Sequence, residues 1–549
     1  MPLQKNQVLT LRVERLSSDG SGVAHSPDGE TVFIPGAAPG DEARVRIVKD
    51  CKRYAFGILD EVLTPSPDRI PVDCAVAGPC GGCSLRHLDY AAELRAKQEN
   101  VADAFARIGG LDVPVLSIVG SPEVNRYRNK VQFPVGVDKS GKPCIGFYAG
   151  RTHRIVPCPD CRLQPGVLNE IGNALCAFFA EKGIQPYSEE TGRGLVRHIF
   201  LRRGAHSGQI MVCLVCTRAK LPSAEELCTR LKAQFAEITT ILLNVNAKNT
   251  NVILGTETHT LYGPGYIEDT LCGVPVQLGP LSFYQVNTLA AEQLYGIAAQ
   301  YAQLTPDDLL LDLYCGMGTI GLSMAAHCRE LIGVEIVPEA IESAKANAAR
   351  MGADVAAKSR FFCADAGQAA TRLAAEGLHP DIVMLDPPRK GCDEATLSAV
   401  VRMSPRRVVY VSCNPATAAR DAAWLEQNGY HAEKVQPVDL FPRTRHCETV
   451  VLLSKGEVDS KKIRVEFSLE DMDMSEFQNG ATYPQIKEYV LEHTGLKVSN
   501  LYISQIKRKC GIEVGKNYNL PKSEDSRQPQ CPPEKEKAIR EAFKYFGMI

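Results

Sequence analysis

Two side chains in the last third of the chain have the types that covalent catalysis needs. Cys413 lies in the run SCNP at 412–415, directly after an apolar stretch, and Glu448 directly precedes the apolar run 449–453. A thiolate is a strong nucleophile, and a partly desolvated glutamate can act as a general base. The pair predicts Cys413 as a nucleophile and Glu448 as a base. The simpler alternatives are an inert buried cysteine and an exposed glutamate at a strand edge.

A second constellation predicts a nucleotide-type pocket. Gly316, Gly318 and Gly321 follow the apolar run 309–313, and glycines there let a ligand approach the backbone closely at a helix N-terminus. Glu335 lies 14 residues after Gly321, at the end of the next apolar run, where a carboxylate would accept hydrogen bonds from ribose hydroxyls. The same glycines satisfy GxGxxG, so a nicotinamide or flavin enzyme is an alternative.

The run DPPRKG at 386–391 ends another apolar stretch. Its two prolines make the turn extended and stiff. We expect it to fix the carboxylate of Asp386 and the cations Arg389 and Lys390 beside the pocket. An ordinary strand-ending turn would not need these three charged residues together.

A group of cysteines predicts a metal centre, and two interpretations stay open. Cys74, Cys80 and Cys83 together with Cys161 could hold an iron–sulfur cluster. The paired CxxC motifs Cys80/Cys83 and Cys158/Cys161 would instead suit zinc. The first set leaves Cys158 unused and the second leaves Cys74 unused. The spacing lacks the tight three-cysteine loop of radical enzymes that use adenosylmethionine.

The elements around these residues predict a doubly wound parallel sheet. Five short apolar runs alternate with Ala-rich helical stretches from about residue 290, at 309–313, 331–335, 360–365, 381–386 and 407–412. Most of them end at a polar residue, which suits ligand binding at the carboxyl edge of the sheet. The first 60 or so residues contain short strand-like runs separated by glycines, which predicts a small barrel.

Composition limits the class of protein. The 549 residues suggest three or four domains, and 44% hydrophobic residues can form real cores. The net charge of −2 excludes a histone-like polycation. We see no leader peptide and no apolar run of roughly the 20 residues that a membrane span needs. We therefore expect a soluble cytoplasmic monomer whose 20 cysteines are reduced, metal-bound or catalytic.

The tail differs from the rest of the chain. Residues 457–476 are acidic, and three helical stretches are expected from about residue 481. Residues 481–549 carry twelve Lys/Arg against eight Asp/Glu, including Lys507, Arg508 and Lys509 on one expected helix. An accessory RNA-binding module of helix-turn-helix type is one interpretation, and a solvated charged face is the other.

Several motifs together resemble those of the RumA/RlmD branch of the TrmA family of RNA (uracil-5-)-methyltransferases. The likeness covers about residues 5–455. Its motifs are CGGCSLRHLDY at 80–90, YRNK at 127–130, SFYQVN at 282–287, DLYCGMG at 312–318, DPPR at 386–389, SCNP at 412–415 and FPRTRHCE at 441–448.

The resemblance implies a Rossmann-like, class I methyltransferase domain in an α/β protein. It implies an OB-like TRAM barrel at 1–63, a central α/β iron–sulfur region at 70–285, the methyltransferase domain at 286–455 and a mostly helical extension at 457–549. It implies S-adenosylmethionine as the methyl donor, and a [4Fe-4S] cluster on Cys74, Cys80, Cys83 and Cys161. The residues expected at the methyl donor are Gln285, Tyr314, Gly316, Gly318, Glu335, Asp365 and Asp386.

The implied substrate is 23S ribosomal RNA, because branch members with both barrel and cluster act on it; neither DNA nor a membrane is expected as a partner. Cys413 would add to C6 of uracil and Glu448 would remove the C5 proton. The target base must be flipped out to be reached. Expected RNA contacts are Arg128, Lys130, Phe283, Arg389 and Lys390, although each could equally be an ordinary surface or core residue.

Three other functions remain as alternatives. An RNA cytosine-5-methyltransferase would share the cysteine chemistry. A nicotinamide-dependent oxidoreductase would use the glycine-rich loop, and a non-catalytic RNA-binding protein would leave Cys413 and Glu448 without a purpose.

Overall fold

The computed structural model describes residues 3–150, 152–248, 250–456, 483–494, 496, 498–510, 512, 531–545 and 548. The chain forms two compact units, Met1–Val458 and Asp459–Ile549. The acidic segment predicted at 457–476 lies outside the described residues.

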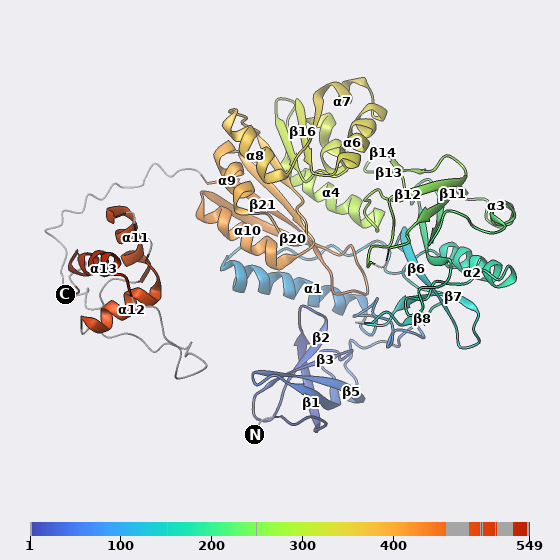
Figure 1. The fold of residues 1–549 in the computed structure, drawn as a ribbon, viewed down its shortest axis with the longest axis horizontal. Coiled ribbons are helices and arrows are strands. Elements are labelled where there is room, and N and C mark those ends of the chain that lie inside the picture. Colours follow the sequence, from blue (N-terminus) through green and yellow to red (C-terminus); the bar gives the residue numbers. More distant parts are fainter. Residues whose placement is uncertain are drawn as a thin grey trace. The chain divides into compact units, whose positions relative to one another are not determined.

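The chain begins with a closed five-stranded barrel, drawn in dark blue in Figure 1. Its strands, in the order β1-β2-β3-β5-β4, are β1 (Val8–Leu16), β2 (Ser21–His25), β3 (Thr31–Pro35), β5 (Tyr54–Thr64) and β4 (Glu42–Asp50). Inward and outward residues alternate along β4, so Ala43, Val45 and Ile47 are fully buried. A Cβ at Gly57 would lie 2.3 Å from Cγ1 of Val45, so this close approach requires glycine. The predicted small barrel is confirmed.

A seven-stranded mixed sheet follows, in the order β12-β11-β10-β9-β6-β7-β8. Its strands are β6 (Lys130–Val137), β7 (Pro143–Tyr148), β8 (Ile155–Pro157), β9 (Val196–Arg203), β10 (Ile210–Cys216), β11 (Ile238–Val245) and β12 (Glu257–Tyr262). Helices α2 (Gly166–Glu181) and α3 (Ala224–Gln234) share a core with one face of this sheet. The other face joins the core of the next sheet through Phe200 and Met211, so β10 is buried throughout.

Helix α1 (Tyr90–Ala104) precedes this sheet, and the hairpin β13 (Ile267–Leu271) and β14 (Val274–Leu278) follows it.

The second large sheet has the order β17-β16-β15-β18-β19-β21-β20. Its strands are β15 (Leu309–Leu313), β16 (Glu330–Glu335), β17 (Ser359–Cys363), β18 (Ile382–Leu385), β19 (Arg407–Ser412), β20 (Tyr430–Val438) and β21 (Glu448–Lys455). Strands β15 to β19 are parallel, and β21 is inserted antiparallel between β19 and β20. This is the doubly wound sheet that the five apolar runs predicted.

Helices cover both faces of this sheet (Figure 1). They are α4 (Thr288–Ala302), α5 (Thr319–Met324), α6 (Pro338–Arg350), α7 (Ala353–Lys358), α8 (Ala366–Ala375), α9 (Glu394–Met403) and α10 (Pro415–Gln427). Along β18, Ile382 and Met384 pack in the core that contains α4, whereas Val383 and Leu385 pack in the core with α8 to α10. Because both faces are buried, the strand is apolar throughout.

The second unit contains α11 (Tyr483–Thr494), α12 (Asn500–Lys509) and α13 (Pro533–Tyr545), as expected for a helical extension. Ile486, Ile503 and Phe543 are fully buried in its core. In the described part of the chain, no helix has both the length and the apolar character that crossing a bilayer requires.

Candidate active site

The predicted catalytic and pocket residues meet at one edge of the second large sheet. Tyr314, Asp386 and Cys413 directly follow β15, β18 and β19, and Glu335 ends β16. These strands are parallel, so their carboxyl ends lie at the same edge. Strand β21 runs the other way and pairs Thr449 with Ser412. Its first residue, Glu448, therefore lies at the same edge as Cys413.

The Glu448 carboxyl group influences the ionisation of the Cys413 thiol. Burial raises the pKa of the Cys413 thiol, and the charge of Glu448 raises it further, whereas a hydrogen bond from Arg389 lowers it. Glu448 is only 6% exposed. Burial, with a contribution from the charge of Asp386, raises the pKa of its carboxyl group to about 8. The Glu448 carboxyl group therefore changes its ionisation close to neutral pH.

Three carboxyl groups, those of Asp312, Glu335 and Asp386, lie close enough at this edge to interact. Burial raises the pKa of Asp386 to about 7. Asp312 is fully buried, and burial raises its pKa to about 8 although the Gly321 amide donates to it at 3.0 Å. The charges of Asp386 and Glu335 raise the pKa of Asp312 further. Such a cluster favours a cationic ligand.

The glycine-rich loop contains three backbone positions with a positive φ angle. Gly316 and Gly318 have φ angles of +55° and +79°, and Tyr314 also has a positive φ, of +65°. A positive φ is uncommon outside glycine and typical of functional sites. A Cβ at Gly321 would lie 2.8 Å from Oδ2 of Asp312, so glycine is required there as well.

The other predicted pocket residues have defined contacts. Glu335 accepts backbone hydrogen bonds from Gly316 at 3.2 Å and from Ile336 at 2.8 Å. Asp365 caps α8 by accepting from the Gln368 amide at 3.1 Å. Gln285 hydrogen-bonds Tyr295, whose pKa is raised by burial and then by the charge of Asp386. Sequence reasoning missed Tyr295, which stands in an Ala-rich helical stretch with no distinguishing motif.

The predicted RNA contacts separate into two groups. Phe283 is 70% exposed and Lys390 is exposed, as an RNA contact would require. Arg389 is exposed too, but its side chain also hydrogen-bonds Cys413. Arg128 and Lys130 instead line a cavity with the cysteines. Burial lowers the pKa of Lys130 to about 8.

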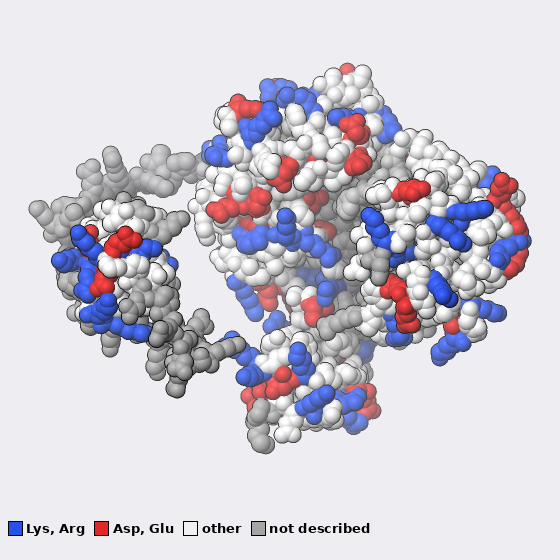
Figure 2. Space-filling model, in the orientation of Figure 1, with Lys and Arg blue, Asp and Glu red and all other residues white. Residues whose placement is uncertain are grey.

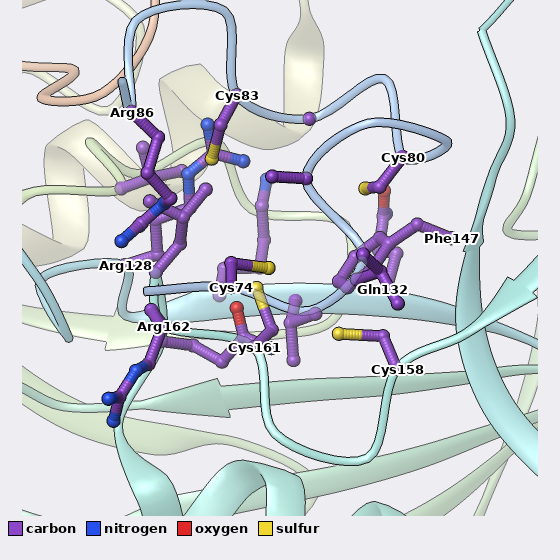
Figure 3. A pocket seen from close by; sticks show the side chains of 18 residues that line it. Cys74, Cys80, Cys83, Arg86, Arg128, Gln132, Phe147, Cys158, Cys161 and Arg162 are labelled. Carbon is purple, nitrogen blue, oxygen red and sulfur yellow. The ribbon is translucent and has the colours of Figure 1, made fainter. Parts of the chain in front are cut away.

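Figure 3 shows this cavity, of about 240 Å³, between two cysteine-bearing loops and the strands of the central sheet. All five candidate cysteines line it: Cys74, Cys80, Cys83, Cys158 and Cys161. A hydrogen bond from Cys158 lowers the pKa of Cys161 to about 6, and Arg128 and Arg86 contribute to this. Across the described ranges, however, no three His, Cys, Asp or Glu side chains form a group that could hold one metal ion.

The sheet order, with a glycine-rich loop and several carboxyl groups at its carboxyl edge, defines a Rossmann-like fold of the class that binds nucleotide-type ligands. The model of the tRNA (Uracil-5-)-methyltransferase family matches residues 207–456, and that of the TRAM domain matches residues 2–59. An uncharacterized RNA methyltransferase of Halalkalibacterium halodurans is 43% identical over 453 residues, which is 82% of this chain and 98% of the relative. One from Listeria monocytogenes is 42% identical over 455 residues, 82% of this chain and 98% of the relative.

A solved structure agrees with these matches. The Pyrococcus abyssi tRNA (uracil-54, C5)-methyltransferase, in complex with S-adenosyl-L-homocysteine, has a TM-score of 0.65 and 27% sequence identity, over 81% of this chain and 100% of that chain. The chain therefore belongs to the RNA (uracil-5-)-methyltransferase family. Its use of S-adenosylmethionine, its TRAM barrel and its action on RNA agree with the predictions, and the oxidoreductase alternative is excluded.

Proposed function

We propose that this protein transfers a methyl group from S-adenosylmethionine to C5 of a specific uridine in 23S ribosomal RNA. The observation that carries the proposal is the position of Cys413 and Glu448 at one sheet edge, near the carboxyl group of Asp386. A nucleophile and a base that act on adjacent atoms of one ring must lie near each other.

Each residue has a distinct step. The Cys413 thiolate adds to C6, and the C5–C6 π electrons move into an enolate whose density lies at C5. C5 bonds to the electrophilic methyl group that S-adenosylmethionine supplies; the electrons of the broken S–CH3 bond stay on sulfur, and S-adenosylhomocysteine leaves. The Glu448 carboxylate then removes the C5 proton; the electrons of that C–H bond re-form C5=C6 and expel the thiolate. The Arg389 guanidinium favours the thiolate before addition and after its release.

The choice of ribosomal RNA rests on the barrel and the cysteine set occurring in one chain. The experiment is mass spectrometry of nucleosides from 23S, 16S and transfer RNA of cells with and without this protein. We expect 5-methyluridine to be missing from 23S RNA alone. Loss of 5-methyluridine from transfer RNA, the substrate class named for the Pyrococcus abyssi protein, would show that transfer RNA is the substrate. Loss of 5-methylcytidine would favour the cytosine alternative.

We assign the methyl donor to the glycine-rich loop with Tyr314, Asp386 and Gln285 beside it, and to Glu335 and Asp365. Its sulfonium cation would relieve the repulsion among the buried carboxyl groups.

We expect Glu335→Gln to weaken binding of S-adenosylhomocysteine by roughly 10- to 100-fold, because a charge-assisted hydrogen bond contributes about 1.5–3 kcal/mol. Titration calorimetry measures this. Glu339→Gln, on the first turn of α6, is the matched control and should bind normally. Unchanged affinity in Glu335→Gln would contradict the assignment.

We propose that Cys74, Cys80, Cys83 and Cys161 hold a [4Fe-4S] cluster. Five thiols around one cavity suit the thiolate ligation of such clusters. The cluster would join the loop at 74–83 to the strands of the central sheet.

Anaerobically purified protein should be brown and contain about four irons per chain. Cys161→Ser should lose most of the iron, whereas Cys144→Ser, a half-buried cysteine outside the cavity, should keep it. Colourless protein that contains zinc, with Cys158→Ser as the damaging variant, would favour the zinc interpretation.

Figure 2 shows basic and acidic side chains interspersed over the visible face. We therefore assign RNA binding to particular small groups of residues and not to one large basic surface. Phe283, Arg389 and Lys390 remain proposed contacts at the active site, as do Arg128 and Lys130 beside the cysteines. To these we add an aromatic group on the outer face of the barrel, which sequence reasoning missed. Its rings, Phe33, Tyr54 and Phe56, have centroids 5.6–5.8 Å apart, and Lys49 pairs with Phe56 on the neighbouring strand. Only the alternation of their strands could have signalled them.

Aromatic rings stack on unpaired bases for about 1–3 kcal/mol each. We expect the double change Phe33→Ala and Tyr54→Ala to weaken binding of a 23S RNA fragment by roughly tenfold or more. Filter binding measures this, and Val8→Ala, an exposed apolar residue elsewhere on the barrel, is the control. Equal affinity of the double variant and the control would show that this face of the barrel does not contact RNA.

We further propose that the divisions 1–63, 70–285, 286–455 and 457–549 are functional modules.

A further inference from the structure

Helix α1 contains two charged side chains that the proposed chemistry does not use. Glu93 and Lys97 lie one turn apart and are 0% and 1% exposed. The Lys97 Nζ donates to Oε1 of Glu93 at 2.7 Å. Burying charges is costly and leaves an uncompensated charge if one partner is lost, so such a pair needs a reason beyond packing.

The third charged residue of this buried cluster is Asp439, which lies 342 residues after Lys97 in the sequence. Lys97 Nζ also donates to Oδ1 of Asp439 at 2.8 Å and to the Phe441 carbonyl at 3.2 Å. Asp439 is fully buried, and its other oxygen accepts from the Tyr90 hydroxyl at 2.9 Å. Lys97 is thus a bridge between α1 and the connection that begins at Asp439.

That connection, residues 439–447, joins β20 to β21 and directly precedes Glu448, the first residue of β21. Most of its anchors lie outside the catalytic sheet. The Arg443 amide donates to Glu93 at 2.7 Å, and its guanidinium donates to the Leu88 carbonyl at 2.7 Å. Asp439 itself accepts from the Phe441 amide at 3.0 Å.

The backbone of the connection is strained at one point. Arg443 has a φ of +69°, which a non-glycine residue keeps only where its surroundings fix it. The Arg443 carbonyl accepts from the amides of Ser84 and Leu85, both at 3.1 Å. With the anchors released, the connection would relax and Glu448 would shift.

We propose that Lys97 is a positioning residue, which bridges Glu93 and Asp439 and thereby fixes the connection 439–447 so that Glu448 reaches the C5 proton. The inference rests on the proposed function, because it concerns the base of that reaction. Cys413 follows β19 and Asp386 follows β18, and neither belongs to the connection. Thiolate addition and methyl transfer should therefore survive a change at Lys97, and only proton removal should slow. The S–C6 bond to the methylated ring then persists.

The experiment measures a methylated covalent complex. Wild-type protein, Lys97→Gln and Glu448→Gln are incubated with S-adenosylmethionine carrying a tritiated methyl group and with total RNA from cells that lack this protein. Denaturing gels separate labelled free RNA from labelled protein–RNA complex. We expect Lys97→Gln to raise the fraction of label in the complex at least tenfold over wild type, toward the fraction in Glu448→Gln, with binding of S-adenosylhomocysteine unchanged within twofold.

Three further variants separate positioning from general stability. Arg95→Gln removes an exposed ion pair of the same helix, with Asp68, and should behave as wild type. Lys97→Arg, which keeps the charge, should return the complex at least halfway to the wild-type fraction. Tyr90→Phe removes the hydrogen bond that Tyr90 donates to Asp439 and the one that it accepts from the Ser121 amide, and should raise the complex about threefold. It decides the question if Lys97→Gln does not fold.

The proposal is overturned if folded Lys97→Gln, or Tyr90→Phe in its place, loses turnover without accumulating the complex, or has wild-type levels of both. Failure of the proposed function gives a different result. In that case Glu448→Gln also forms no labelled complex, or wild-type protein labels no RNA.

Discussion

Replacing Cys413 with alanine is expected to abolish methylation of RNA, with a loss of roughly 10⁴-fold or more, as is typical when a catalytic nucleophile is removed. Without the thiolate, C5 of the pyrimidine is too weak a nucleophile to attack a sulfonium methyl group. The measurement is transfer of a tritiated methyl group to RNA from cells that lack the protein. Binding of S-adenosylhomocysteine should persist, because most of the residues that we assign to the methyl donor follow or end other strands of the sheet.

Cys51→Ala, a half-buried cysteine of the barrel region, is the matched control and should keep full activity. A complementary test uses RNA with 5-fluorouridine at the target position. Fluorine cannot leave as a proton does, so the wild-type protein should remain attached to this RNA through Cys413. Normal turnover without any such attachment, or activity retained in Cys413→Ala, would refute the covalent mechanism.

Replacing Glu448 with glutamine is expected to lower turnover by about 10²- to 10⁴-fold, the usual contribution of a general base. The defect should be specific, because addition and methyl transfer precede the step that needs the base. Methylated RNA should therefore accumulate as a covalent complex with Cys413, visible on a denaturing gel. Glu433→Gln, an exposed glutamate on β20, should turn over normally.

The acidity of Glu448 adds a pH dependence to this prediction. Its pKa is raised to about 8, so the carboxyl group keeps its proton at lower pH and is then inactive as a base. As the pH rises toward 8, breakdown of the complex should become about tenfold faster per pH unit. Above pH 8 the rate should level off. In Glu448→Gln the residual rate should lose this slope. A flat profile in the wild-type protein, or turnover unaffected by the substitution, would assign proton removal to another group.

Much of the catalytic sheet could be predicted because its physics is local. Strands buried on both faces are apolar along their whole length, and the polar residue that follows each one marks the carboxyl edge. The runs around Glu335, Asp386 and Cys413 therefore predicted a common edge. The positive φ angles at Gly316 and Gly318 were equally predictable, since glycine adopts them without a penalty.

The contacts between distant segments could not be predicted in this way. Arg128 lines the cysteine cavity, and Arg389 hydrogen-bonds the thiol of Cys413; neither neighbour could be predicted from the sequence. Both side chains are basic residues in polar runs, and a run of sequence does not say which distant segment lies opposite.

The sequence by itself determined the parallel sheet, the barrel and the candidate nucleophile and base, because hydrophobic periodicity and strand ends are properties of neighbouring residues. Only the tertiary structure decided that β21 lies between β19 and β20, which brings Glu448 beside Cys413. It also decided that Lys97 pairs with Asp439, which lies 342 residues further along the chain. Such pairings depend on how whole layers pack, and local patterns of residue type do not contain that information.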